Sequence, residues 1–480
     1  MLDQFRQRVK QWFHANGQLI LATSAPCYVQ VAAIEASHSG EHSVRLWIRR
    51  IAPHKAHRWR CPATFRGQLC YEWQNMNQKP NTTAERIDSI DVLRGFAVLG
   101  ILLLNIQSFG LTGAEYFNPI ARGPLEGVSY WTWYFTFVLG DMKFMAIFSM
   151  LFGAGIVLMS QRAEKLSQPF TRLHYRRMAW LMLLGVMHAH FVWHGDVLFL
   201  YSVCGLGVYL LRGLRARWLI LAGVGLLCIG SGLSILSGIS IPYWTEADHA
   251  EMLADWQPTA DQLADELAAM RGGWTSHFAW RTHEAFMMET FVLMFWGIWR
   301  AGGLMLMGMA LFKLGFFSAK KPLKAYAAVV AIGLSIGLPI VMYGVHQNEA
   351  RQWNYDYSFF LGSQFNYWGS VFVAIAYTSI IMLLCQWKNS LAWLKQSLAA
   401  TGRMALTNYL AQSVICTTIY YGHGLGWYAH HSRPQLLLVV FSVWVVQLIA
   451  SPIWLNRYRY GPLEWLWRSL SYWRMQPMAR

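Results

Sequence analysis

The sequence contains few charged residues. Only 13% of its 480 residues are Asp, Glu, Lys or Arg, whereas 55% are hydrophobic. A soluble domain needs a more polar surface than this, so we predict an all-α, polytopic protein whose partner is the lipid bilayer. Acidic residues are scarcer than basic ones, and the net charge is +16. In a membrane protein basic residues collect in cytoplasmic loops, so this excess does not indicate binding of nucleic acid.

Cysteines spaced for metal binding or for a disulfide framework are absent. No two of the seven cysteines form a C-x-x-C pair, and four of them fall inside predicted spans: Cys204, Cys228, Cys385 and Cys416. We therefore predict neither a zinc motif nor a disulfide framework. We also predict no signal peptide in the N-terminal region, because its apolar run, residues 19–22, is too short.

Residues 1–85 have no sustained apolar period. They are basic and irregular, with scattered His, Cys and Trp, and Met76 then opens a short polar stretch before the first long apolar run. We favour the interpretation that the native chain starts at Met76 and that the preceding residues are translated upstream sequence. The alternative is a small cytoplasmic domain.

Ten apolar runs follow, each interpreted as a helix that crosses about 30 Å of hydrocarbon. They cover residues 92–110, 131–159, 178–194, 197–211, 218–238, 286–314, 325–345, 360–385, 404–421 and 435–454. The short fourth run and the long second and sixth runs indicate uneven tilt or breaks.

The loops between the runs differ in charge. Every even-numbered run is followed by a basic loop, which predicts that both termini lie in the cytoplasm. The acidic insert 241–283 contains one predicted amphipathic helix and would form a cap on the opposite side. Residues 461–480 predict an interfacial helix and a tail.

Three histidines and an aspartate occur in the nine residues 188–196, from the end of the third run to the start of the fourth. Ionisable groups at such a position are costly unless they serve a function. We predict that Asp196 orients His188 as a general base. For His194 we favour instead an interfacial belt with Trp193, and we expect it to share a helix face with His190. A metal site would require the helix to unwind, and we predict none.

Two further basic residues lie within predicted spans. Lys143 lies in the second run and Arg300 near the centre of the sixth, too deep for its side chain to reach the interface. Arg300 should face the bundle interior, where it would bind an anionic ligand or form a structural ion pair. The small residues Gly153, Gly155, Gly302 and Gly303 predict close helix packing.

The first run carries a family resemblance. Residues 86–106, RIDSIDVLRGFAVLGILLLNI, resemble the opening of the YeiB-like family of bacterial inner-membrane proteins, a domain of unknown function. Four later stretches agree with it: Lys143-Phe144 with Leu151–Gly155, Trp193–Asp196, Gly402–Tyr409 and Gly461–Trp467. The resemblance covers residues 86–470 and implies a location in the bacterial inner membrane.

The Asp-x-x-Arg-Gly sequence at residues 91–95 is similar to that of the wider membrane acyltransferase group, which includes acyltransferase-3 and heparan-glucosaminide acetyltransferase proteins. In that group acyl-CoA in the cytoplasm donates across the membrane to an acceptor, usually a sugar, with a histidine as base. Asn105 stands where acyltransferase-3 has its histidine, and residues 111–130 contain no histidine. His188 with Asp196 would therefore have to replace that base.

Two functions from different classes remain. For acyl transfer, Arg94 would hold the phosphates of acyl-CoA, and the remaining substrate contacts would come from Asn105, Lys143, Trp193 and Arg300. The alternative is a transporter in which Arg300 binds a small anionic solute while His188 and Asp196 relay protons. The absence of an evident inverted repeat weighs against transport, and a membrane scaffold without a ligand is a third interpretation.

Overall fold

The computed structural model describes residues 20–21, 28–31, 48–51, 88–387 and 391–480. The chain divides into two compact units, Met1–Asn77 and Gln78–Arg480. Three short strands of the first unit pair antiparallel in the order β1-β2-β3: β1 (Ile20–Leu21), β2 (Tyr28–Val31) and β3 (Ile48–Ile51). No strands were predicted in this region, which has no sustained apolar period. Met76 and most of residues 1–85 lie outside the described residues, so the proposed start at Met76 stays a prediction.

All regular elements in the described part of the second unit are helical. The principal helices are α3 (Asp88–Gly110), α4 (Gly113–Phe117), α5 (Gly127–Gly140), α6 (Lys143–Lys165), α7 (Thr171–Phe191), α8 (Leu198–Val208), α9 (Ala216–Ser240), α10 (Glu246–Trp256), α11 (Ala260–Arg271), α12 (Trp274–Met287), α13 (Ile298–Lys313), α14 (Leu323–Glu349), α15 (Tyr355–Tyr357), α16 (Ser363–Gln386), α17 (Ala392–Arg403), α18 (Ala405–Tyr420), α19 (Arg433–Arg457) and α20 (Pro462–Tyr472). Two π-helical segments, η4 (Met288–Gly297) and η6 (Ser358–Gly362), precede α13 and α16. Short 3-10 turns are η2 (Tyr209–Leu211), η3 (Ile241–Tyr243) and η5 (Phe316–Ser318).

Seven helical segments in the described residues are long and apolar enough to cross a membrane. Each of the ten predicted runs coincides with a helix, but the runs at α7, α8 and α18 are not among these seven. α8 and α18 are too short, and α7 is rich in Arg and His. The membrane character is therefore confirmed, whereas ten spans and the orientation stay predictions.

The two longest predicted runs are irregular, as their length indicated. The second is divided into α5 and α6 at Met142, whose backbone is left-handed with φ of 63°. The sixth run lies in a helical segment that is continuous over Trp274–Lys313 and that contains the π-helical turns of η4 before α13. π-helical turns inside helices often mark functional sites.

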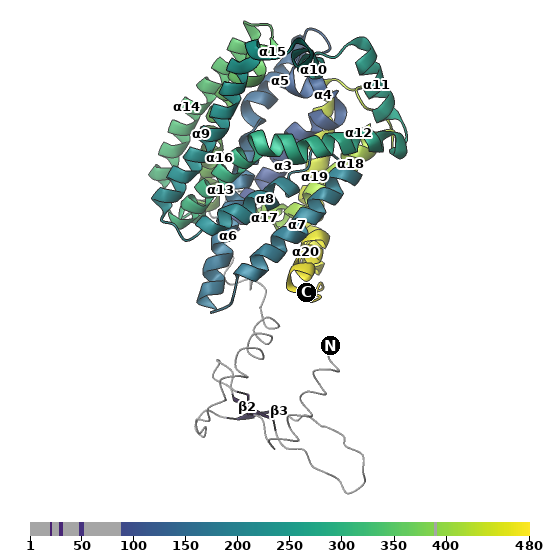
Figure 1. Cartoon of the computed structure of the whole chain (residues 1–480). Helices are drawn as coiled ribbons and strands as arrows, with labels where there is room; N and C mark the ends of the chain where they lie inside the picture. The colour runs from purple at the N-terminus through teal and green to yellow at the C-terminus, as the bar shows by residue number, and fades with distance from the viewer. Residues whose placement is uncertain (1–19, 22–27, 32–47, 52–87, 388–390) are drawn as a thin grey trace. The chain divides into compact units, whose positions relative to one another are not determined.

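Helix α3 occupies the interior of the second unit. In an apolar stretch of 18 residues in α3, 78% of the residues are buried. In the corresponding stretches of the segments that contain α9, α14 and α19, only 28% are buried, so these three helices are peripheral. α9 packs on α13 and α14 packs on α16, and both outer helices lie towards one edge of the bundle in Figure 1. α3 packs closely on α17, because a Cβ at Gly402 would lie only 1.9 Å from the Asp91 carbonyl oxygen. An apolar helix buried on nearly all sides is typical of the core of a membrane bundle.

Small residues produce the other close helix contacts. A Cβ at Gly153 would lie 2.0 Å from the Met305 carbonyl oxygen, and one at Gly303 would lie 2.7 Å from that of Gly223. Close packing is therefore confirmed for Gly153 and Gly303. It is wrong for Gly155, where a Cβ meets open space.

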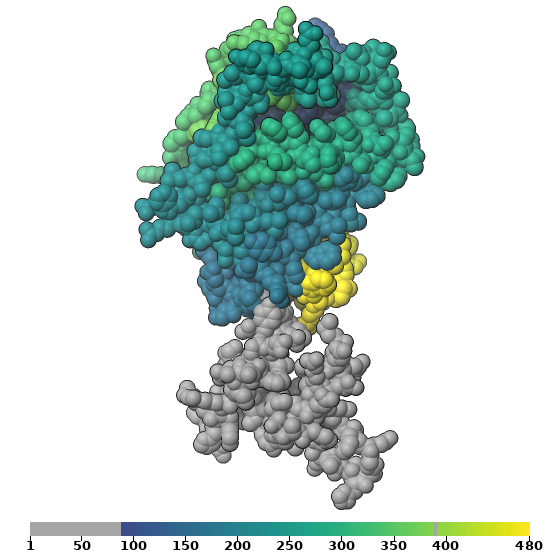
Figure 2. Space-filling view, viewed as in Figure 1, coloured from purple at the N-terminus to yellow at the C-terminus, as the bar shows by residue number. Residues whose placement is uncertain are grey.

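The acidic insert forms a cap of two helices, α10 and α11, where one helix was predicted. They gather with α4 at one end of the bundle, which we call the cap end (Figure 1). Glu266 Oε1 on α11 accepts hydrogen bonds from Gly113 N at 2.8 Å and Tyr428 Oη at 2.6 Å. Burial raises the pKa of the Glu266 carboxyl. The surface is hollowed between the cap and the helices below it (Figure 2).

Helix α20 lies at the opposite end of the bundle (Figure 1). Trp467 Nε1 donates to the Arg177 carbonyl oxygen on α7 at 2.9 Å. The Glu464 carboxylate accepts from the backbone N–H of Leu406 and Thr407 and so satisfies free donors in the first turn of α18. The Gly461–Trp467 stretch of the family resemblance therefore connects α20 with both α7 and α18.

Candidate functional site

A histidine and a carboxylate meet at the turn between α7 and α8. His188 Nδ1 lies 2.7 Å from Asp196 Oδ1, and each side chain is only 2% exposed. The second oxygen, Oδ2, accepts from Phe199 N in the first turn of α8 at 2.7 Å. Because both carboxylate oxygens are engaged, Asp196 fixes the His188 ring relative to α8.

The turn is held against the interior helix by Trp193. Its ring lies 4.3 Å from that of Phe109 near the end of α3, and Trp193 is only 2% exposed. Gly195 allows this ring to fold back over the turn, since a Cβ there would lie 2.3 Å from the indole. The Trp193 ring thus packs between the turn and α3. Its Nε1 is buried without a hydrogen-bond partner among the described residues.

The second nitrogen of His188 is available for chemistry. An ionised carboxylate only accepts hydrogen bonds, so a neutral His188 carries its proton on Nδ1 and presents a lone pair at Nε2. Nε2 is buried and has no partner in the part of the chain that the structure describes. The Tyr409 ring lies 5.4 Å from the His188 ring, and its hydroxyl accepts from Val197 N at 3.3 Å. A histidine with this arrangement is suited to general-base catalysis.

The two other histidines of the turn do not share a helix face. α7 ends at Phe191, so His194 lies beyond it and the predicted shared face is wrong. His190 Nε2 lies 3.2 Å from Glu289 Oε2, and the His194 ring lies 5.3 Å from that of Trp280. Within the described ranges no three His, Cys, Asp or Glu side chains are grouped as metal ligands.

Lys143 belongs to a second polar cluster, between α6 and α16. Its ammonium is fully buried and donates to Asn366 Oδ1 at 2.7 Å and to the Phe137 carbonyl oxygen at 3.1 Å. Asn366 Nδ2 donates to Asp141 Oδ2 at 2.6 Å. The Asn366 amide therefore connects the buried Lys143 ammonium with the half-buried Asp141 carboxylate.

Arg300 on α13 also faces the interior, as predicted, and is fully buried. It donates to the Tyr367 carbonyl oxygen at 2.5 Å and to Ser370 Oγ at 2.6 Å. Its guanidinium lies 4.4 Å from the centroid of the Tyr367 ring. These partners on α16 are neutral, and Arg300 Nε has no hydrogen-bond partner among the residues described.

The remaining predicted residues lie along α3. Arg94 Nη1 pairs with Asp91 Oδ1 at 3.0 Å, and the Arg94 side chain remains 30% exposed. Asn105 is half-buried. The structure therefore brings His188, Trp193 and Asp196 together, but it places Lys143 and Arg300 in contacts with α16 and Arg94 in the first turns of α3.

Three residues of these surroundings were missed by sequence reasoning: Tyr409, His277 and Arg281. Tyr409 falls within the Gly402–Tyr409 stretch of the resemblance, which was the only signal for it. His277 and Arg281 are four residues apart and share a face of α12. That spacing of two ionisable residues next to an apolar run could have identified them.

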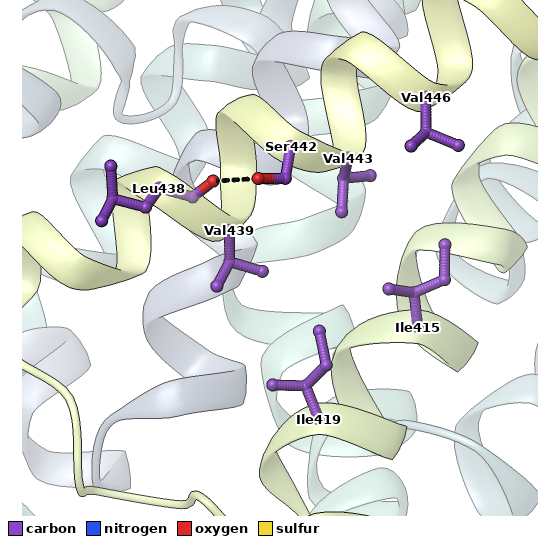
Figure 3. A pocket seen from close by; sticks show the side chains of 7 residues that line it. All are labelled: Ile415, Ile419, Leu438, Val439, Ser442, Val443 and Val446. Atoms are coloured by element: carbon purple, nitrogen blue, oxygen red, sulfur yellow. Dashed lines mark hydrogen bonds between the residues drawn. The ribbon is translucent and has the colours of Figure 1, made fainter.

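The groove between α18 and α19 is apolar (Figure 3). Its lining consists of aliphatic side chains and one hydroxyl: Ile415, Ile419, Leu438, Val439, Ser442, Val443 and Val446. The Ser442 hydroxyl donates to the Leu438 carbonyl oxygen at 2.7 Å. Because the one polar side chain in this lining already donates its hydrogen bond to the backbone, the groove is suited to contact with hydrocarbon chains.

Comparison with known proteins gives consistent similarities. Residues 311–474 match the family described as Protein of unknown function (DUF418). "Uncharacterized protein YeiB" of Escherichia coli (strain K12) is 34% identical over 401 residues, which cover 81% of this chain and 96% of that protein. "Uncharacterized protein YxaH" of Bacillus subtilis (strain 168) is 30% identical over 423 residues, covering 84% of this chain and 98% of the relative.

Proposed function

The chain belongs to the YeiB-like family of uncharacterised membrane proteins, and we propose that it transfers an acyl group from cytoplasmic acyl-CoA to a hydroxyl group on the other side of the membrane. The supporting observation is the buried pair of His188 and Asp196. The Asp196 carboxylate holds His188 Nδ1, and His188 Nε2, which has no hydrogen-bond partner among the described residues, can accept a proton. The acceptor would be a sugar or another small molecule with a hydroxyl group.

In this reaction His188 acts as the base. Nε2 takes the proton of the acceptor hydroxyl as the hydroxyl oxygen attacks the thioester carbonyl carbon. The new C–O bond forms, the C–S bond breaks, and the CoA sulfur leaves with the proton returned from Nε2. Asp196 stabilises the imidazolium that forms between these steps. No oxidant, reductant or further reactant is needed.

The donor would enter at the start of α3. The Arg94 side chain is partly exposed there, and arginine can bind a phosphate group through two parallel hydrogen bonds. Lys143, Arg300, Asn105 and Trp193 would contact the substrates between that entry and His188. α3 spans 23 residues, or about 34 Å, so the acyl group has to travel along most of this helix.

The experiment is binding of acetyl-CoA to the detergent-purified chain by calorimetry. We expect saturable binding by the wild type and by His188→Ala, because the base is not needed to hold the donor. Turnover with an accepted hydroxyl substrate should fall about 10²- to 10⁴-fold in His188→Ala. His190→Gln is the matched control, since its side chain pairs with Glu289 and not with Asp196. No acetyl-CoA binding by a folded wild type would overturn the proposal.

Transport of a small anionic solute is the second candidate. It is favoured by the buried Arg300, whose hydrogen-bond partners on α16 are neutral and whose Nε has no partner in the described part of the chain. Charged residues inside a membrane bundle often bind substrate. Arg300→Gln should then abolish proton-coupled uptake into vesicles. Uptake equal to that of the wild type would remove the support for transport.

A further inference from the structure

Helix α12 carries a guanidinium that is completely buried. Arg281 is 0% exposed, and its Nε donates to the His190 carbonyl oxygen at 2.9 Å. Its Nη1 lies 3.1 Å from His277 Nδ1. None of the ion pairs among the described residues involves Arg281, and its Nη2 has no hydrogen-bond partner there. A buried charge without a counter-ion is strongly unfavourable, so this arrangement calls for an anion.

The neighbouring polar groups are also donors. Arginine can only donate, so His277 Nδ1 must accept its hydrogen bond and the His277 proton lies on Nε2. That Nε2–H is buried and unpartnered in the described part of the chain, as is the Tyr421 hydroxyl. The rings of His277 and Tyr421 lie 4.6 Å apart. Unpaired donors thus come together from α12 and from the loop after α18.

We infer that Arg281, His277 and Tyr421 form a binding site for an oxyanion, either a carboxylate or a phosphate group. The guanidinium supplies the charge and a pair of N–H groups, and the His277 imidazole and the Tyr421 hydroxyl supply further donors. The rings of Trp274 and Phe278 lie 5.1 Å and 5.7 Å from the guanidinium and shield it from lipid. In the adjacent loop, burial and then the Arg281 charge lower the pKa of His423.

The oxyanion site adjoins the pair of His188 and Asp196. Arg281 binds the backbone of His190, two residues after His188. The Trp193 ring lies 6.3 Å from the His188 ring and 6.0 Å from that of His194, which in turn contacts Trp280 on α12. If the proposed function holds, an acyl acceptor that binds at this site carries an oxyanion as well as the hydroxyl group that is acylated; this extension rests on the proposed function. The binding site itself does not depend on acyl transfer.

The test uses the full chain in nanodiscs of zwitterionic phosphatidylcholine, titrated with inorganic phosphate at constant ionic strength. Thermal unfolding and tryptophan fluorescence report binding, the latter because Trp274 adjoins Arg281. We expect a saturable response that Arg281→Gln weakens about 10- to 100-fold, as the loss of charge-assisted hydrogen bonds predicts. Arg281→Lys keeps the charge and should bind with intermediate affinity. Arg122→Gln, which removes a charge from an exposed pair with Glu115, should respond like the wild type.

A second arm identifies the source of the oxyanion. Nanodiscs with added phosphatidylglycerol should raise the unfolding temperature of the wild type more than that of Arg281→Gln if a lipid headgroup fills the site. An Arg281-dependent response to phosphate alone assigns a soluble ligand. The inference is overturned if neither phosphate nor anionic lipid gives a response that depends on Arg281, or if Arg122→Gln loses the response equally. These binding readouts remain valid even if the chain has no acyltransferase activity.

Discussion

Gly185 lies directly against the carboxylate of Asp196. A Cβ at Gly185 would lie 2.8 Å from Asp196 Oδ2 and 2.4 Å from Phe199 N, and both distances are shorter than real contacts allow. The absence of a side chain on α7 therefore lets α8 approach closely enough for Asp196 to reach His188. The position of the carboxylate depends on a residue with no functional group of its own.

Gly185→Ala should separate the two helices and disturb the pair of His188 and Asp196. We expect a loss of about 1 to 3 kcal/mol in the free energy of unfolding from overpacking, with a marked fall in any His188-dependent activity. Thermal unfolding in detergent measures the first effect. The matched control is Gly207→Ala on α8, where a Cβ meets nothing within 4 Å. Equal behaviour of the two variants would show that the close approach is not required.

Asp196→Asn tests the role of the carboxylate without changing its size. The amide oxygen can still accept from Phe199 N, but an amide does not stabilise a protonated His188 and can favour the wrong tautomer. Under the acyl-transfer proposal kcat should fall about 10²- to 10⁴-fold while acetyl-CoA binding and the unfolding temperature stay near the wild-type values. An unchanged kcat would exclude Asp196 as the orienting group.

Alanine substitutions at Gly153 and Gly155 should have different effects on stability, although both glycines belong to one small-residue sequence. Gly153→Ala would place a methyl group 2.0 Å from the Met305 carbonyl oxygen, so we expect destabilisation of about 1 to 3 kcal/mol or more. Gly155→Ala meets open space and should be neutral or stabilise the helix by about 0.5 to 1 kcal/mol. Thermal unfolding of both variants checks this. A loss at Gly155 as large as at Gly153 would contradict the packing described for α6 and α13.

The sequence contained enough information for the helices and for the central pair of residues. Apolar runs specify membrane helices because the backbone N–H and C=O groups of each run must form hydrogen bonds within that run. The irregularities at Met142 and η4 fall in the two runs that are longer than one span needs. His188 and Asp196 are eight residues apart, so a single turn brings them together. Such local relations can be read without knowing how the helices pack.

Contacts between distant helices were not accessible in the same way. Asn366 meets Lys143 across 223 residues of sequence, and Arg281 meets the His190 backbone across 91. Hydropathy gives the depth of a residue but not the neighbouring helix that it faces. The sequence likewise did not show which of Gly153 and Gly155 contacts another helix, because residues two apart lie on different faces of one helix.

Asn366 should be important for stability because it is the shared partner of Lys143 and Asp141. Asn366→Leu would leave a fully buried ammonium with only the Phe137 carbonyl oxygen as acceptor. We expect destabilisation of about 3 kcal/mol, measured by thermal unfolding. Combining it with Lys143→Met and Asp141→Asn removes both charges and should recover much of the loss. A single Asn366→Leu variant as stable as the wild type would show that the amide is dispensable.

We expect Glu266 to make the attachment of the cap sensitive to pH. Burial is the largest influence on its carboxyl and raises the pKa, while hydrogen bonds from Tyr428 and Gly113 oppose the shift. The folded state therefore binds this proton more tightly than the unfolded state. The stabilisation is complete below the ordinary glutamate pKa and is lost as the pH rises through the raised pKa of the folded state.

Glu266→Gln keeps an oxygen for both hydrogen bonds but removes the titration. We expect the variant to gain unfolding temperature relative to the wild type as the pH increases from 4 towards 8, because only the wild type then buries a carboxylate. Asp265→Asn, an exposed neighbour on α11, is the control for a simple change of charge. A difference between Glu266→Gln and the wild type that is constant with pH would mean that Glu266 gains no proton affinity on folding, and the cap would then be held by packing and neutral hydrogen bonds alone.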